Sequence, residues 1–203
     1  RFESLLGYIR KERPEYVFIG GDILPHNGVV GRPGFEGIND FIADFMMPKF
    51  MELKKIMDCA YPDIFMIPGN DDRKDLLGGL VQGEKEELWY NLHNTKKHFG
   101  KYTFYGYGCV PLTPFQLKDW ERFDTDKTVP AGCIDFKKGQ FSLPSEKHEP
   151  EKTIQEELEE LFAEEDQAFG VWLFHTPPFN SGFDVIKDSS GNELHVGSKA
   201  VAR

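Results

Sequence analysis

Three side chains with metal-binding chemistry each follow a short apolar run of the chain. They are Asp22 after residues 16–19, Asn70 after residues 63–67 and His175 after residues 169–174. Carboxylate and amide oxygens together with an imidazole nitrogen form a hard-to-borderline ligand set that suits Mn, Fe, Ni or Zn. Metal ions held by such ligands activate water for hydrolysis. The residue types therefore indicate metal-assisted hydrolysis, and this chemistry needs no cysteine.

The apolar runs that precede these residues have the features of buried β-strands. Each is short, bounded by turn residues and hydrophobic over nearly its whole length, which predicts a sheet covered on both faces. Side chains at the carboxyl ends of such strands lie where open α/β sheets bind their ligands. A second interpretation stays open, because Asp22 and Asn70 are also good N-cap residues for a following helix.

The order and spacing of these motifs resemble the calcineurin-like metallophosphoesterase superfamily. The matching residues are Gly21-Asp22, Gly69-Asn70-Asp71-Asp72 and His175. The resemblance implies an α/β fold of one domain, a layered αββα sandwich with mixed central sheets flanked by helices. It also implies hydrolysis of a small-molecule phosphoester, as a phosphatase or a phosphodiesterase, by a water that bridges two divalent cations.

The resemblance assigns roles to the matching residues. Asp22 is expected to bridge the two cations, and Asn70 and His175 are expected to bind the second one. Mn or Fe is the expected metal, with Zn or Ni as alternatives. Asp71 stands where the family has a histidine that assists the leaving group. Asp71 is therefore the expected catalytic residue, although a neighbouring cation opposes the raised pKa that a general acid needs.

Two further family motifs are missing from the 203 residues. No Asp-x-His precedes Asp22, and no Gly-His-x-His follows His175. We expect the sequence to be part of a longer polypeptide that supplies the ligands of the first metal. The alternative is a catalytically inactive scaffold or protein-interaction module with a metallophosphoesterase fold.

Three further residues are expected near the substrate. His26 lies four residues after Asp22, and His195 follows a turn at residues 188–192 that predicts a hairpin folding back over the site. Ser198, with its neighbour Lys199, is expected near a helix N-terminus, where backbone N–H groups bind anions.

The chain is expected to form a single domain over residues 1–203, with residues 111–150 as an insertion or cap. This proline-containing segment has neither helical nor strand periodicity, so it is interpreted as a substrate-facing cap or as a solvated connecting loop. Elsewhere the patterns predict helices over residues 1–13, 38–57 with a break at Pro48, 75–81 and 149–166, and a strand over residues 102–108.

The sequence Asp124-Thr125-Asp126-Lys127-Thr128 matches the DxDxT signature of haloacid-dehalogenase-like phosphatases, whose first Asp is a nucleophile. That signature needs a buried strand directly before it. The preceding residues 118–123 are mostly charged, so the segment is interpreted as a turn.

The net charge of −10 is largely local, because residues 149–166 hold nine acidic side chains against the single Lys152. The spacing of their apolar residues predicts an amphipathic helix with a solvated acidic face. Without a basic surface, nucleic-acid binding is not expected. The three widely spaced cysteines are expected to be reduced, and no apolar run is long enough to predict a membrane span. A cytoplasmic protein is the resulting expectation.

Overall fold

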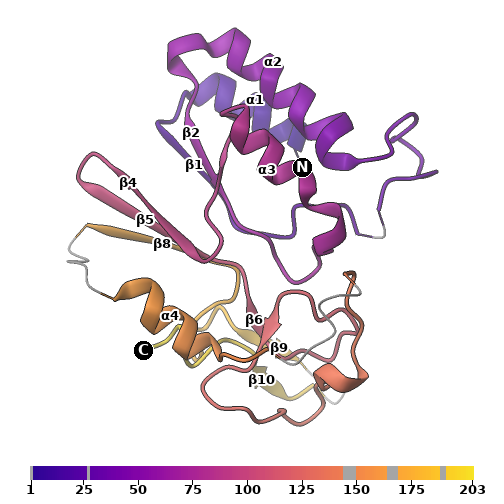
Figure 1. Ribbon diagram of the computed structural model, residues 1–203, viewed down its shortest axis with the longest axis vertical. Coiled ribbons are helices and arrows are strands. Elements are labelled where there is room, and N and C mark those ends of the chain that lie inside the picture. Colours follow the sequence, from indigo (N-terminus) through magenta and orange to yellow (C-terminus); the bar gives the residue numbers. More distant parts are fainter. Residues whose placement is uncertain (1, 27, 144–149, 164–168, 188–190) are drawn as a thin grey trace.

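The structure is a computed structural model, and it describes residues 2–26, 28–143, 150–163, 169–187 and 191–203 (Figure 1). The α-helices are α1 (Phe2–Glu12), α2 (Met47–Met57), α3 (Gly78–Lys85) and α4 (Ile154–Phe162). The strands are β1 (Tyr16–Ile19), β2 (Asp63–Met66), β3 (Tyr90–Asn91), β4 (Thr95–Phe99), β5 (Tyr102–Tyr107), β6 (Val110–Pro111), β7 (Glu121–Arg122), β8 (Gly170–Phe174), β9 (Val185–Lys187) and β10 (Glu193–His195).

Two small sheets form the centre of the fold. The first is parallel, in the order β1-β2-β3, and the second is mixed, with β5 antiparallel to β4 and parallel to β8. The sheets pack face to face through aromatic residues, and the ring centroids of Phe65 and Phe104 lie 4.6 Å apart. The α/β class predicted from the sequence is confirmed.

Strand β2 shows why a near-continuous apolar run is needed here. Its last three residues are buried, and alternate side chains along the run that ends at Ile67 enter different clusters. Ile64 and Met66 pack with the helices, whereas Phe65 and Ile67 pack with the second sheet. The first sheet therefore has helices on one face and the second sheet on the other.

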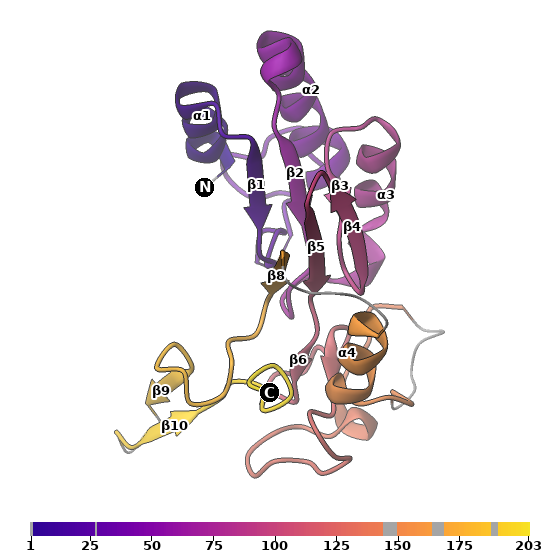
Figure 2. The ribbon, with the colours of Figure 1, turned by 90° about the vertical axis from the view of Figure 1, so that its left-hand side faces the viewer.

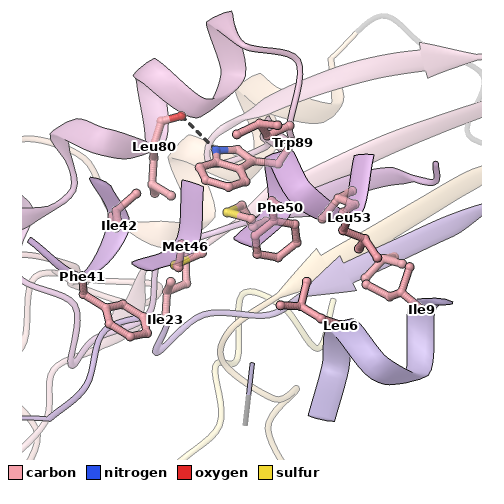
Figure 3. Packing of buried hydrophobic residues seen from close by; sticks show 14 of the residues in the cluster. Leu6, Ile9, Ile23, Phe41, Ile42, Met46, Phe50, Leu53, Leu80 and Trp89 are labelled. Atoms are coloured by element: carbon pink, nitrogen blue, oxygen red, sulfur yellow. Dashed lines mark hydrogen bonds between the residues drawn. The ribbon is translucent and has the colours of Figure 1, made fainter. Parts of the chain in front are cut away.

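The helical layer consists of α1, α2 and α3, which share one hydrophobic cluster with β1 and β2 (Figure 3). Phe50 lies against Trp89 in this cluster, and the indole N–H of Trp89 donates to the carbonyl of Leu80 at 2.9 Å. A π-helical turn over Phe41–Met46 leads into α2, and the change falls one residue before Pro48. The chain stays helical from Phe41 to Met57, so the predicted break at Pro48 is wrong. The hydrogen-bonding pattern changes from π to α next to Pro48, which has no N–H to donate.

Helix α4 covers the other face of the second sheet. It begins at a capping box in which Thr153 and Glu156 exchange hydrogen bonds, and Ile154 and Leu158 are its buried residues. The ring of Phe162 lies 5.3 Å from that of Tyr105 in β5. The helix predicted over residues 149–166 is present over Ile154–Phe162, and the described residues 150–153 before it are not helical. Residues 144–149 and 164–168 lie outside the described part of the chain.

The strands β1 and β2 point towards the middle of the molecule, where a second region of the chain begins (Figure 2). This region contains β6, β7, the β9–β10 hairpin and the turns between residues 111 and 143. Leu112, Phe123 and Phe136 form a buried cluster of their own there, and Lys118 makes a fully buried ion pair with Glu121 at 2.6 Å. The described residues of the 111–150 segment are therefore folded; their role as a cap remains a prediction.

His93 packs at the junction of these two regions. Its Nδ1 accepts a hydrogen bond from the backbone N–H of Gly108 at 3.0 Å, and its ring lies 4.8 Å from that of Trp120. Burial, followed by the positive charges of Arg122 and Lys74, lowers the pKa of His93 to about 3.

This lowered pKa predicts a loss of stability in acid. Below pH 6.5 His93 binds a proton in the unfolded chain, but in the folded chain it stays neutral until the pH approaches 3. The free energy of unfolding is therefore unaffected by His93 above pH 6.5 and falls as the pH drops from 6.5 towards 3. His93→Asn retains an acceptor for Gly108 but does not titrate. Between pH 7 and 4.5 the wild type should lose about 2 kcal/mol more than His93→Asn, measured by urea unfolding. Equal losses would contradict a neutral, buried His93.

None of the helices in the described residues is long and apolar enough to cross a membrane.

Candidate metal centre

The three predicted ligands Asp22, Asn70 and His175 lie together at the carboxyl ends of β1, β2 and β8. Asp22 and Asn70 follow adjacent parallel strands of the first sheet, and His175 follows the edge strand of the second sheet. The backbone N–H of His175 donates to the carbonyl of Tyr107, which holds the end of β8 against β5. The site therefore lies where the two sheets meet the second region of the chain (Figure 2).

The imidazole of His175 faces oxygen atoms on both of its ring nitrogens. Its Nδ1 lies 2.7 Å from the carbonyl oxygen of Gly20. Its Nε2 lies 3.1 Å from Oδ1 of Asn70 and 3.4 Å from Oδ1 of Asp22. Two oxygen donors and one nitrogen donor thus converge on a single point.

This arrangement fixes the proton on Nδ1 of His175. A carbonyl oxygen can only accept, so Nδ1 must donate to Gly20, and Nε2 presents a lone pair to two further acceptors unless a cation lies among them. Burial by itself lowers the pKa of His175, but hydrogen bonds to Asp22 and to the Gly20 carbonyl raise it above its ordinary value. The lone pairs of Nε2, Asn70 Oδ1 and Asp22 Oδ1 would otherwise face one another. Either a proton on Nε2 or a divalent metal ion between the three atoms removes this repulsion.

Two glycines permit this close approach. A Cβ on Gly69 would lie 2.3 Å from Oδ1 of Asp22 and 2.6 Å from Cε1 of His175. Gly21 has a φ of +102°, and a Cβ there would lie 2.4 Å from Nδ1 of the same imidazole. The glycines of both motifs are therefore required by the packing of the ligands.

Asp72 joins the two loops, and the sequence reasoning missed this role. Its side chain is fully buried and accepts backbone N–H groups from Ile23 at 3.1 Å, Leu24 at 2.8 Å and Gly69 at 2.8 Å. Its own carbonyl accepts the indole N–H of Trp120 at 2.7 Å. The available signal was the second carboxylate of Asn70-Asp71-Asp72, since an aspartate satisfies several loop N–H groups at once.

Asp71, the predicted catalytic residue, lies between Asp22, a predicted metal ligand, and His26. Its backbone N–H donates to Oδ1 of Asp22 at 3.1 Å, and its Oδ2 lies 2.7 Å from Nδ1 of His26. The structure thus brings both predicted residues to the site. The His26 side chain is 71% exposed and that of Asp71 42%, so solvent weakens the contact between them.

A cavity of about 610 Å³ begins at Asn70 and His175 and extends into the second region of the chain. Its walls come from described residues between 110 and 133 and from described residues between 176 and 199. The walls include apolar side chains, Val110, Leu112, Phe115, Phe179, Ile186 and Leu194, with His195 and Lys199 among the polar ones. The cavity is therefore suited to the organic part of a molecule whose other end lies at Asn70 and His175.

Of the other substrate-proximal predictions, His195 lines this cavity, whereas Ser198 is fully buried and bound by protein. The Ser198 hydroxyl donates to Asp124 at 2.6 Å, and that carboxylate also accepts the Lys199 N–H at 2.7 Å. The anion at this turn is thus Asp124 itself. Residues 124–127 form bends, in agreement with the predicted turn.

The predicted hairpin is present as β9 and β10, in the register that pairs Leu194 with Ile186. Residues 188–190 of its turn lie outside the described part of the chain.

Within the described ranges, no group of three or more His, Cys, Asp or Glu side chains converges to hold a metal. Comparisons of the chain with known protein families, with curated proteins and with solved structures found no match.

Proposed function

We propose that this chain carries part of a dinuclear metal site that hydrolyses small-molecule phosphoesters, as in the calcineurin-like metallophosphoesterases. One observation carries the proposal: Nε2 of His175 lies 3.1 Å from Oδ1 of Asn70 and 3.4 Å from Oδ1 of Asp22. Three segments distant in the sequence deliver these donors to one point. The set favours Mn or Fe, with Zn or Ni as alternatives.

The chain's own residues would prepare the site in three ways. The Gly20 carbonyl orients His175 so that Nε2 faces inwards, and Asp22 supplies the negative charge that attracts a cation. Asp22 is 42% exposed, so ions reach it from solvent. Bound divalent cations would neutralise phosphoryl oxygens and lower the pKa of water. The cavity beyond Asn70 receives the organic part of the substrate.

The arrangement of layers agrees with this proposal. Helices α1, α2 and α3, the first sheet, the second sheet and α4 pack in that order, as expected for an αββα sandwich. The metallophosphoesterase fold itself, the cytoplasmic location and the absence of nucleic-acid partners remain predictions.

Metal removal tests the proposal directly. Chelation of the full-length protein should abolish hydrolysis of p-nitrophenyl phosphate and bis(p-nitrophenyl) phosphate, and Mn²⁺ should restore at least one of these activities by about 100-fold or more, since Lewis-acid stabilisation is worth several kcal/mol. Elemental analysis should find two metal ions per chain. A full-length protein that retains no metal and hydrolyses neither ester would instead favour the scaffold alternative.

A further inference from the structure

His195 makes a second imidazole–carboxylate pair, separate from the metal ligands. Its Nδ1 lies 3.1 Å from Oδ1 of Asp184, whose side chain is fully buried. The other oxygen of Asp184 accepts the backbone N–H of Asn180 at 2.8 Å. Burial alone would raise the pKa of Asp184, but the hydrogen bonds from Asn180 and His195 lower it below its ordinary value, so the carboxyl group is ionised.

This pair fixes the orientation of the His195 ring. An ionised carboxylate only accepts, so Nδ1 of His195 must donate to Asp184. The other nitrogen, Nε2, is therefore the one that can exchange a proton with a ligand. The ring packs 5.5 Å from that of Phe179, and His195 lines the 610 Å³ cavity that Asn70 and His175 also line. The side chain is 35% exposed, which leaves Nε2 accessible to a ligand.

The backbone brings the two histidines into neighbouring segments. Pro178 and Ser198 form a parallel β-bridge, and His175 and His195 each stand three residues before a member of that bridge. Two backbone hydrogen bonds of 2.9 Å hold these segments together, from the N–H of Ser198 to the carbonyl of Pro177 and from the N–H of Phe179 to that of Ser198. The imidazole of His195 is thus carried beside the chain that supplies a metal ligand.

We infer that His195, positioned by Asp184, is the general acid that protonates the leaving group during phosphoester hydrolysis. This inference rests on the proposed function. It assigns to a distant hairpin the task expected of Asp71, whose carboxylate is paired with His26. Lys199, with its Nζ 5.4 Å from the Phe179 ring, places a cation on the same wall of the cavity.

The proton and electron balance is as follows. The P–O bond to the leaving group breaks, its electron pair stays on the leaving oxygen, and that oxygen takes the proton from Nε2 of His195. The attacking water forms the new P–O bond, and the proton that it gives up restores the imidazolium through solvent. Such proton transfer matters most for a leaving group that is a strong base, and contributes about 10²–10⁴-fold.

The test compares two leaving groups in the full-length, metal-reconstituted protein. Esters of p-nitrophenol need little protonation, whereas esters of phenol, with a pKa of about 10 like that of the tyrosine side chain, need much more. His195→Asn keeps a donor for Asp184 but removes Nε2. It should reduce kcat/KM for the phenyl ester by about 100-fold and for the nitrophenyl ester by less than about 10-fold. His98→Asn, on the edge strand β4, is the matched control and should change neither value.

Several outcomes would overturn the inference. Equal losses on both esters would make His195 structural, and a phenyl-specific loss in His26→Asn with none in His195→Asn would transfer the role to the Asp71–His26 pair. A separate readout tests Asp184: long-range ¹H–¹⁵N spectra of neutral His195, assigned against His195→Asn, should show its proton on Nδ1. Finding that proton on Nε2 would exclude Asp184 as the positioning residue. A wild type inactive on both esters would overturn the proposed function instead.

Discussion

Asp22→Asn is expected to weaken Mn²⁺ binding by about 100-fold, a loss of about 3 kcal/mol, and to remove most of the phosphoesterase activity. Asparagine retains an oxygen that can accept the Asp71 N–H, so the loop loses little of its hydrogen bonding. It also tolerates the φ of 49° at this position. The substitution removes the negative charge that faces His175. Isothermal titration with Mn²⁺ and turnover of bis(p-nitrophenyl) phosphate measure the two effects.

Asp58→Asn is the matched control for this experiment. Asp58 is exposed, has a φ of 50° and lies in the connection before β2, which is the opposite end of that strand from Asn70. The two substitutions change the charge and the backbone preferences in the same way. Metal binding and turnover should therefore remain unchanged in Asp58→Asn. Near-normal turnover in Asp22→Asn would remove Asp22 from the metal site.

The strands that hold the site could be predicted because their hydrophobic runs show in the local sequence. The predicted burial on both faces holds for β2 but is wrong for β8, which is only partly buried and exposes Trp172. The run that became β2 is apolar after Asp63 because neighbouring residues, such as Ile64 and Phe65, pack into two different clusters on opposite faces of the strand. Helix α4 could also be predicted from the spacing of its apolar residues, but over the longer range 149–166. The capping box of Thr153 and Glu156, which sets its start, was not part of that prediction.

Contacts between distant segments were not readable in the same way. Asp72 accepts N–H groups from a loop nearly fifty positions earlier, and Asp124 binds the turn at Ser198, 74 positions later. Each looks like an ordinary turn aspartate, because the sequence shows the acceptor and not its donors. The same holds for Asp184, whose burial beside His195 depends on how the hairpin folds.

Short strands were also missed for a physical reason. β6 and β7 consist of two residues each, too few for a period-2 pattern to appear. Their pairing depends on tertiary support, including the buried ion pair of Lys118 with Glu121. Residues 118–123, whose charges suggest solvent exposure in the sequence, are thus partly buried in the structure.

Gly69→Ala should disrupt the contact between the loops that carry Asp22 and Asn70. The new Cβ would lie 2.4 Å from the backbone nitrogen of Asp22 and 2.3 Å from its Oδ1. Backbone atoms cannot rotate away, so the loops after β1 and β2 must separate. We expect a loss of about 1–3 kcal/mol in the free energy of unfolding, which lowers the Tm by several degrees in a chain of this size.

Gly7→Ala is the matched control, because a Cβ at Gly7 meets nothing within 4 Å inside α1 and should stabilise the helix by about 1 kcal/mol. The same methyl group thus has opposite effects on stability at the two positions. Added Mn²⁺ should raise the Tm of the wild type and of Gly7→Ala through binding to the folded state, but not that of Gly69→Ala. If Gly69→Ala kept this metal-dependent rise in Tm, the loops would be able to bind metal without the close approach of Asp22 and His175. The geometry of the site would then not explain why residue 69 is glycine.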